Sequence, residues 1–341
     1  MGKFGSGDTS WFVRERFGMF IHWGLYSMPA RHEWVRHNEK ITNEEYQKYF
    51  EHFNPDLFNP KEWAKAAREA GMRYFVITTK HHEGFCMWDS KYTDYKVTNT
   101  PCGRDLLREV VDAFRAEGIH VGFYYSLIDW HHPDFIIDNR IGPYRELSEE
   151  ERKKMNEGRD MKRYARYMRD QVRELLTEYG KIDILWFDFS YPAPDGNPEH
   201  GKGHNEWESE ELVKMIRSIQ PDIILDNRLD LPDEGDIHTP EQYTPREGLR
   251  DKDGNPIVWE GCQTFSGSWG YHRDEQTWKS PKQCIDLLID HVSRGGNLLM
   301  NVGPTSRGYL DRRAMDCLKA YANWMHYNKR SIYNCGPAPR E

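Results

Sequence analysis

The sequence predicts an α/β fold, a (β/α)8-like TIM barrel that is irregular in its later units. Short apolar or β-rich runs recur along the chain, and a helical pattern follows most of them, which is typical of βα units in a parallel sheet. The chain has 341 residues, and α/β barrels of about 250 residues or more commonly form one domain. We therefore expect residues 1–341 to fold as a single domain.

Six runs are the clearest candidates for strands, namely residues 19–24, 74–82, 120–127, 183–190, 222–228 and 297–304. Residues 235–242 and 257–265 bring the number to eight, although no helical pattern is evident after either. The alternative is a doubly wound open sheet. No GxGxxG or GxxxxGKS/T motif follows any of these runs, which disfavours the nucleotide-binding version of that alternative.

Three segments carry the spacing of an amphipathic helix. In residues 159–180 the apolar side chains recur every three or four positions, which places them on one face. Residues 60–71 and 312–328 show a similar pattern. Elsewhere, residues 191–210 are expected to be a loop that leads into a helix, and residues 246–256 an exposed turn.

Composition disfavours several classes of function. The formal net charge of -8 gives no basic surface for nucleic acid and favours a neutral or small partner. No stretch approaches 18 apolar residues, and the N-terminus lacks the apolar segment of a signal peptide. We therefore expect no membrane span and a cytoplasmic location, with secretion open if a leader has been removed. The six cysteines lack the spacing of a zinc site and are expected to be reduced thiols: Cys86, Cys102, Cys262, Cys284, Cys317 and Cys335.

Polar residues gather where the expected strands end. In a parallel barrel the catalytic groups project from the carboxyl ends of the strands, whereas the strands themselves are apolar. A single histidine at such a position is more often structural, but three histidines at two neighbouring ends favour a site. The polar residues at these ends are His22, Lys80, His81, His82, Asp188, Asn227, Arg228 and Asn301.

Tryptophans lie beside the same motifs. A tryptophan at a strand end usually serves packing, yet flat indole faces also suit the C–H faces of a sugar ring. The five that lie beside polar strand ends are Trp23, Trp34, Trp88, Trp186 and Trp269.

Asp188 is the most informative carboxylate. In "IDILWFDFS" a period of two puts it on the same face as Ile184 and Trp186. An aspartate among aromatic residues carries a desolvation cost, so we expect it to have partners and a function rather than to be a surface residue. Hydrolysis of a glycosidic bond needs a second carboxylate. The candidates, which spacing alone does not separate, are Glu33, Glu83, Glu241 and Glu260.

Eight motifs occur together and in order: "RFGMFIHWGLYSMPARHEW", "KHHEGFCMWDS", "VGFYYSLIDW", "LWFDFSYP", "DNR", "HTPEQ", "GSWGY" and "GGNLLMNVGP". As a set, they are specific. The chain resembles the catalytic domain of the α-L-fucosidases of glycoside hydrolase family 29, from about residue 11 to residue 335.

The resemblance implies a retaining hydrolase without cofactor or metal, acting on a fucosylated oligosaccharide or glycoconjugate. By motif position, Asp188 is the nucleophile and Glu241 the acid/base residue, with Glu33 as the alternative. His22 would bind a sugar hydroxyl, and Gly24 would let the chain turn sharply. The fucose pocket would be lined by His22, Glu33, Trp34, His81, His82, Tyr124 or Tyr125, Trp186 and Arg228, with Trp269 as an aromatic wall.

The chain departs from the family pattern in one respect, and the resemblance does not predict its oligomeric state. Family members often carry a C-terminal β-sandwich, whereas this chain ends soon after residue 335 without one, so we expect either a single-domain member or a chain from which that domain has been removed. A homo-oligomer is compatible with the sequence, and neither nucleic acid nor membrane is an expected partner.

Two other classes of function stay open on the residues alone. One is a metal-dependent hydrolase on the same scaffold. It is weakened because His81 and His82 are adjacent, so that on a strand their side chains would leave in opposite directions, and because the HxH and HExxH motifs are absent. The other is a non-catalytic sugar-binding protein, which would have no need for both Asp188 and Glu241.

Overall fold

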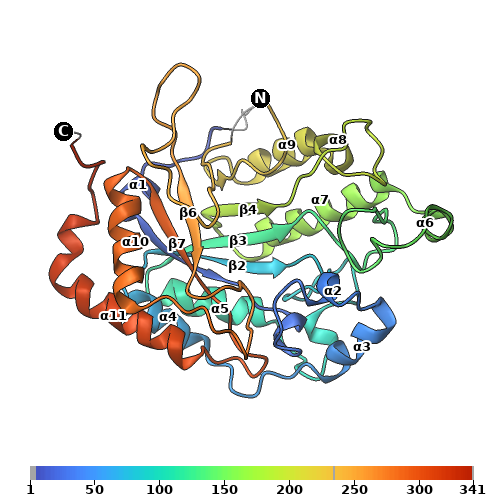
Figure 1. The fold of residues 1–341 in the computed structure, drawn as a ribbon, viewed down its shortest axis with the longest axis horizontal. Helices are drawn as coiled ribbons and strands as arrows, with labels where there is room; N and C mark the ends of the chain where they lie inside the picture. The colour runs from blue at the N-terminus through green and yellow to red at the C-terminus, as the bar shows by residue number, and fades with distance from the viewer. Residues whose placement is uncertain (1–4, 233–234, 340–341) are drawn as a thin grey trace.

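The computed structural model describes residues 5–232 and 235–339. Within them, seven parallel strands form one sheet in the order β5-β4-β3-β2-β1-β7-β6 (Figure 1). The strands are β1 (Phe17–Ile21), β2 (Tyr74–Lys80), β3 (His120–Ser126), β4 (Ile184–Asp188), β5 (Ile224–Leu225), β6 (Glu260–Thr264) and β7 (Asn297–Val302). Strand β1 is fifth in this order, between β2 and β7, so the last two strands along the chain join the sheet on the side of β1 away from β2.

An eighth parallel segment lies between the two edge strands. Residues 237–241 form three isolated parallel bridges, Asp226 with Ile237, His238 with Trp259, and Glu241 with Cys262. The segment contains Pro240, which has no N–H to donate, and this contributes to pairing by single bridges rather than by a regular ladder. The result is a curled, parallel, (β/α)8-like domain, as the sequence predicts.

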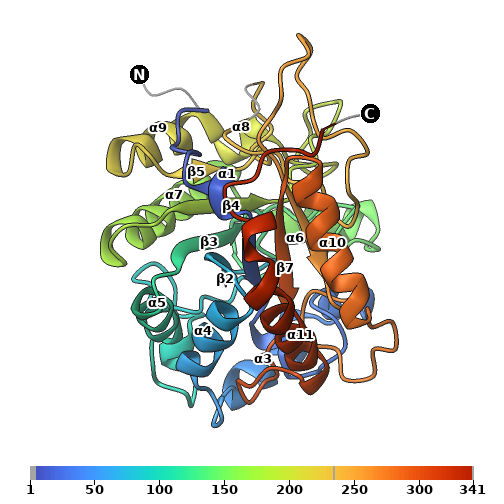
Figure 2. The same cartoon turned by 90° about the vertical axis from the view of Figure 1, so that its left-hand side faces the viewer.

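Helices cover the outside of the sheet (Figures 1 and 2). Helices α4, α7 and α11 confirm the three predicted amphipathic segments. The helices are α1 (Phe12–Glu15), α2 (Val35–Asn38), α3 (Asn43–His52), α4 (Pro60–Glu69), α5 (Leu106–Ala116), α6 (Glu149–Asn156), α7 (Met161–Glu178), α8 (His204–Trp207), α9 (Ser209–Ile219), α10 (Pro281–Ser293) and α11 (Arg312–Asn328).

Helix α10 follows β6 and was not expected from the sequence. The overlooked signal lies at its start, where the Ser280 side chain accepts from the Gln283 backbone and the Gln283 side chain accepts from the Ser280 backbone. This is a capping box, and Pro281 occupies the first helical turn, where its missing N–H costs nothing.

Buried apolar residues form two layers, one between the strands and the helices and one inside the curl of the sheet. The predicted alternation along β4 is confirmed, since Ile184 and Trp186 belong to the inner layer and Leu185 and Phe187 to the outer one. The six cysteines are free thiols. Among the described residues, no helix combines the length and apolar character needed to cross a membrane.

Candidate active site

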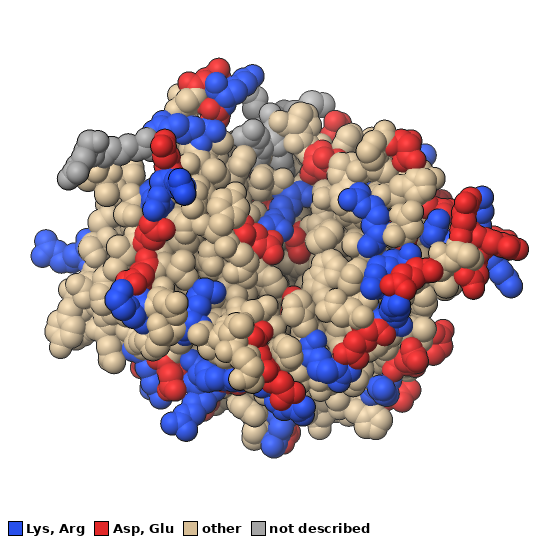
Figure 3. All heavy atoms as spheres, in the orientation of Figure 1, with Lys and Arg blue, Asp and Glu red and all other residues tan. Residues whose placement is uncertain are grey.

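A pocket opens at the carboxyl ends of the strands, with a volume of about 600 Å³. Figure 3 shows the hollow on this face of the molecule, with acidic and basic side chains beside it. Eleven of the twelve residues assigned to the site from the sequence line it: His22, Glu33, Trp34, His81, His82, Tyr124, Trp186, Asp188, Arg228, Glu241 and Trp269.

Asp188 lies at the last position of β4, where two donors hold its carboxylate. Tyr124 donates its hydroxyl to Oδ2 at 2.8 Å, and Arg228 donates Nη1–H to Oδ1 at 2.7 Å. His82 is close by, with Nε2 at 3.8 Å from Oδ2. The carboxylate is therefore fixed in orientation while its side chain stays 13% exposed to the pocket.

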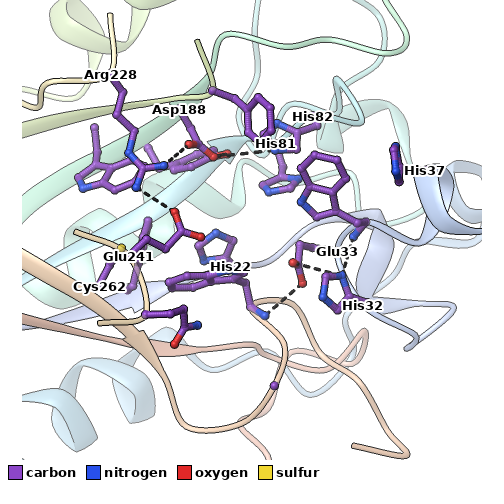
Figure 4. Close-up of a pocket in the computed structure, with 18 of the residues that line it drawn as sticks. His22, His32, Glu33, His37, His81, His82, Asp188, Arg228, Glu241 and Cys262 are labelled. Atoms are coloured by element: carbon purple, nitrogen blue, oxygen red, sulfur yellow. Dashed lines mark hydrogen bonds and ion pairs between the residues drawn. The ribbon is translucent and has the colours of Figure 1, made fainter. Parts of the chain in front are cut away.

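Arg228 joins the two carboxylates of the predicted reaction (Figure 4). Its second terminal nitrogen, Nη2, contacts Oε2 of Glu241 at 2.9 Å. Thr239 accepts from Nε through its hydroxyl at 3.0 Å and from Nη2 through its carbonyl at 3.2 Å. The guanidinium also lies over the ring of Trp186, 4.3 Å from the ring centroid. Five contacts thus fix one planar cation between Asp188 and Glu241.

His22 is held by a short chain of hydrogen bonds. The Asn301 amide nitrogen donates to the Trp269 carbonyl at 2.7 Å, so its oxygen faces Nδ1 of His22, also at 2.7 Å. His22 therefore donates from Nδ1, and Nε2 carries the lone pair. Burial lowers the pKa of His22 to about 3, which keeps the ring neutral.

His82 has the same tautomer for a similar reason. Its Nδ1 lies 2.7 Å from the hydroxyl of Ser126, and that hydroxyl donates its own proton to the Ile128 carbonyl. Burial lowers the pKa of His82 to about 3 and the pKa of His81 well below its usual range. The pocket thus presents neutral imidazoles, which suit an uncharged, hydroxyl-rich ligand.

The expectation that His81 and His82 point in opposite directions is wrong. Strand β2 ends at Lys80, so both histidines lie in the turn that follows, where side chains no longer alternate. Their ring centroids are 4.1 Å apart, and both rings face the pocket (Figure 4). This adjacency does not create a metal site: among the residues described, no group of three His, Cys, Asp or Glu side chains has an arrangement that would hold a metal ion.

Glu33 lies in the pocket wall, where its carboxylate contacts other groups of the protein. Its Oε2 accepts from the backbone N–H groups of Trp269 and Gly270 at 3.1 and 2.8 Å, and its Oε1 lies 3.2 Å from Nδ1 of His32. Burial raises the pKa of Glu33. This carboxylate therefore fixes the loop that carries Trp269 against the loop after β1.

The other two carboxylate candidates lie outside the pocket. Glu83 accepts from the Tyr46 hydroxyl and from the Leu25 N–H, and Glu260 accepts from the Tyr74 hydroxyl. Both are fully buried, and burial raises the pKa of each to about 7. Neither contacts the space in which a substrate would bind.

Several residues singled out in the sequence lie elsewhere. The Tyr125 hydroxyl donates to Gln171 on α7 at 2.7 Å, on the side of β3 away from the pocket, so Tyr124 is the tyrosine at the site. Trp23 packs on Phe58 in the outer layer, and Trp88 donates to Glu174 at 2.7 Å. These indoles are packing residues, not sugar platforms.

Gly24 has a different role from the expected sharp turn. Its φ of -176° is extended, so no left-handed conformation requires glycine there. A Cβ at this position would lie 2.5 Å from Oε1 of Glu83 and 2.8 Å from the ring of Tyr26. Glycine is needed for close packing of the turn after β1.

Sequence reasoning missed Phe189 and Gln242, which also line the pocket. Each directly follows one of the two predicted catalytic carboxylates, and each has a positive φ, 78° and 60° respectively. Such backbone is costly for a non-glycine residue and often marks functional sites. No signal in the sequence shows it, because neither residue is one that favours this conformation.

Comparisons with known proteins agree on one family. The family model described as alpha-L-fucosidase matches residues 7–330. The tissue alpha-L-fucosidase of Mus musculus is 29% identical over 355 residues, covering 96% of this chain and 72% of the mouse protein.

Among solved structures, alpha-L-fucosidase isoenzyme 1 from Paenibacillus thiaminolyticus is similar with a TM-score of 0.91 and 50% identity, over 98% of this chain and 78% of that one. A family 29 alpha-L-fucosidase from Bacteroides thetaiotaomicron, solved as a trapped covalent intermediate with 2-fluoro-fucosyl fluoride, has a TM-score of 0.81 and 32% identity. That similarity covers 96% of this chain and 76% of the other.

Proposed function

The chain belongs to the alpha-L-fucosidase family of glycoside hydrolases, and from this membership we propose how its own residues carry out the reaction. It is a retaining exo-glycosidase that removes terminal α-L-fucosyl groups, and the covalent intermediate trapped in the Bacteroides relative supports the two-step mechanism. The assignment of residues depends on one observation: a single guanidinium, that of Arg228, contacts both Asp188 and Glu241.

Asp188 is the nucleophile in this proposal. Its oxygen attacks the anomeric carbon, the bond to the leaving oxygen breaks, and a fucosyl ester of Asp188 forms. Tyr124 and Arg228 each donate to one carboxylate oxygen. They therefore orient the attacking group before substrate arrives, which reduces the reorganisation needed in the transition state.

Glu241 is the acid/base residue. It protonates the leaving oxygen in the first step and removes a proton from water in the second. Retaining glycosidases have their two carboxyl groups about 5 to 5.5 Å apart, and contact with the two terminal nitrogens of one guanidinium keeps Asp188 and Glu241 close together. At 42% exposed, the Glu241 side chain can reach both the leaving group and water.

The substrate is a fucosylated oligosaccharide or glycoconjugate. Neutral His22, His81 and His82 offer hydrogen bonds to hydroxyl groups, and Trp269 supplies an aromatic wall beside His22, with ring centroids 5.2 Å apart. Apolar contact with the C5 methyl group of fucose discriminates against sugars that lack it by about 1 to 3 kcal/mol. Galactose-like substrates are therefore expected to be poor rather than excluded.

We also propose that the eight parallel segments make one complete (β/α)8 catalytic barrel. The bridges of residues 237–241 to both neighbouring segments support this architecture. They also explain how Glu241 reaches the mouth, since its bridge to Cys262 fixes the backbone at the end of the eighth segment.

The test is release of 4-nitrophenol from 4-nitrophenyl α-L-fucoside by the wild-type protein and by Asp188→Ala. We expect the variant to lose at least about a thousand-fold in turnover, because no group replaces the nucleophile. A parallel wild-type sample with EDTA should keep its activity. Turnover by Asp188→Ala close to that of wild type would contradict the assignment, and loss with EDTA alone would indicate a metal-dependent hydrolase.

A further inference from the structure

We propose that a groove beside the pocket binds the sugar unit to which fucose is attached. The groove has a volume of about 370 Å³ and is lined by Phe189, Ser190, Asn227, Arg228 and Asp230. Phe189 and Arg228 also line the main pocket, so these two side chains separate the hollows and belong to both. The inference rests on the proposed function, since it identifies the leaving-group side of the same site.

The position of Arg228 places the groove on that side. The guanidinium contacts both Asp188 and Glu241, so the anomeric carbon and the oxygen that Glu241 protonates lie beside it. The leaving sugar must extend from this oxygen away from the fucose pocket. The groove on the other side of Arg228 and Phe189 is the adjoining space that accommodates it.

The backbone of Phe189 is strained. Its φ of 78° is a conformation that bulky residues rarely adopt. The ring is retained by Trp34, His82 and Tyr191, with centroids 5.3, 5.4 and 5.6 Å away. Glycine would fit this backbone without strain. The ring therefore has a use at this position, and a half-buried aromatic face between two hollows suits the C–H face of a second sugar.

Polar groups of the groove suit a neutral ring with hydroxyl groups. The Oδ2 atom of Asp230 accepts from the backbone N–H of His204, at the start of α8, and also lies 3.0 Å from Nδ1 of the same histidine. This fixes the carboxylate, and within the described part of the chain Oδ1 has no partner. The Asn227 side chain holds Thr239 through its oxygen, which leaves its amide nitrogen as a donor.

Charge argues against an anionic ligand. Among the described residues, Arg228 is the only cation that lines the groove, and its guanidinium is already engaged by Asp188, Glu241 and Thr239. Asp230 adds a negative charge to the wall. A phosphate or a carboxylate would be repelled, whereas sugar hydroxyls can donate to Asp230.

The experiment compares two kinds of substrate on the full chain. One is α-L-fucosyl fluoride, whose single-atom leaving group does not reach the groove. The other is a pair of α-L-fucosyl disaccharides, with galactose or N-acetylglucosamine as the second sugar. The test variant is Asp230→Gly, because glycine accepts the φ of 55° at this position. The matched control is Asp195→Gly, which removes an aspartate similarly paired with a histidine, His200, outside the groove.

We expect Asp230→Gly to lower kcat/KM for the better disaccharide by about ten-fold, the typical effect of losing a hydrogen bond to a charged acceptor. Its kcat/KM for α-L-fucosyl fluoride should stay within about two-fold of wild type. Asp195→Gly should leave both values unchanged. If Asp230→Gly does not fold, Phe189→Gly tests the same assignment. Its kcat/KM for the disaccharide, divided by its kcat/KM for α-L-fucosyl fluoride, should be lower than the wild-type ratio.

Equal losses on both substrates, or no loss on the disaccharide, would overturn the groove assignment. So would a wild-type protein that hydrolyses the fluoride and neither disaccharide, although the fucosidase function would then stand. A wild-type protein that hydrolyses no fucoside at all would overturn the proposed function and the groove assignment with it.

Discussion

Glu241 and Glu33 have environments that suit different tasks. Glu33 is buried and its Oε2 accepts from two backbone N–H groups, so a proton transfer there would disrupt a loop contact. Glu241 is exposed to the pocket and its Oε2 contacts the side chain of Arg228. A residue that must exchange a proton with substrate and with water needs the second environment.

Removal of Glu241 should therefore produce an enzyme that azide rescues. In Glu241→Ala the fucosyl ester on Asp188 should still form from a substrate with a good leaving group, and azide, which needs no general base, should attack it. We expect α-L-fucosyl azide as product. In Asp188→Ala the azide should instead attack the substrate directly and give β-L-fucosyl azide. Proton NMR of the products distinguishes the two anomers.

Glu33→Gln is the control for this assignment. It keeps the size of the side chain and an oxygen acceptor for Trp269 and Gly270, so we expect its turnover not to respond to azide. Rescue of a Glu33 variant, together with the absence of rescue for Glu241→Ala, would exchange the two roles.

The sequence could predict which residues form the candidate site, but it could not predict which of them contact one another. Strand ends point to His22, His82 and Asp188 because a parallel barrel brings those ends together. Spacing does not show that Arg228 contacts two carboxylates, because Glu241 comes from a segment without a regular ladder. Nor does it show the left-handed backbone of Phe189, which packing of its ring with its neighbours holds in place.

The end of β2 is attached to the loop after β3 by a buried ion pair. Lys80 donates from Nζ to Oδ2 of Asp129 at 3.1 Å and to the Tyr164 hydroxyl at 3.1 Å, and both charged side chains are almost fully buried. The Trp130 N–H donates to the His82 carbonyl at 2.8 Å. The pair thus supports the segment that presents His82 to the pocket.

Lys80→Met should destabilise the protein by about 3 to 5 kcal/mol, because it leaves the Asp129 carboxylate buried without its cation. The double variant Lys80→Met/Asp129→Asn should recover a large part of this loss, since an asparagine needs no counter-charge and still accepts from the backbone N–H groups of His131 and His132. Urea unfolding followed by tryptophan fluorescence measures the free energy of unfolding of each protein.

An exposed ion pair provides the comparison. Lys91 contacts Glu178 at the surface, where its side chain is 69% exposed, so Lys91→Met should leave the free energy of unfolding close to that of wild type. If Lys80→Met and Lys91→Met changed the free energy of unfolding by similar amounts, burial of the Lys80–Asp129 pair would not make its loss more destabilising than the loss of an exposed pair.

The regular elements follow from local pattern, and the exceptions follow from tertiary contacts. Periodicity predicts α4, α7 and α11, because each has one apolar face toward the sheet. Strand β5 contains only two residues of the predicted run at 222–228. Asp226 ends it, since its Oδ1 accepts from the Phe187 N–H of the neighbouring strand at 3.2 Å and so replaces a ladder partner. Such a contact is not visible in the sequence.

Across the whole molecule, the inside of the curled sheet contains more ionisable groups than its apolar strands suggest. Glu260 lies there against Tyr74, and the Trp186 indole N–H is a further neighbour of its carboxyl group. Trp186 in turn lies under Arg228. The layer beneath the active site therefore contains a carboxyl group that keeps its proton to a higher pH in the folded protein than in the unfolded chain, and its titration should affect the stability of the entire fold.

The sign of this effect follows from the two states. Burial raises the pKa of Glu260 to about 7 in the folded protein, against about 4.3 in the unfolded chain. Between these values the unfolded state loses its proton while the folded state keeps it, so the free energy of unfolding falls as the pH rises. Glu260→Gln removes the titration. Relative to wild type, this variant should therefore gain about 2 kcal/mol in stability between pH 5 and pH 8.

Urea unfolding of both proteins at pH 5, 6, 7 and 8 measures that gain. The titrations of His22 and His82 are common to both proteins and cancel in the difference, which isolates Glu260. The control is Glu45→Gln, because its hydrogen bonds with Thr42 lower the pKa of Glu45 and keep it ionised throughout this range, and glutamine preserves the capping box of α3. If the stability difference between Glu260→Gln and wild type proved as independent of pH as the difference between Glu45→Gln and wild type, that result would contradict the prediction. It would mean that Glu260 has the same pKa in the folded and unfolded states, and hence that water reaches the interior of the barrel.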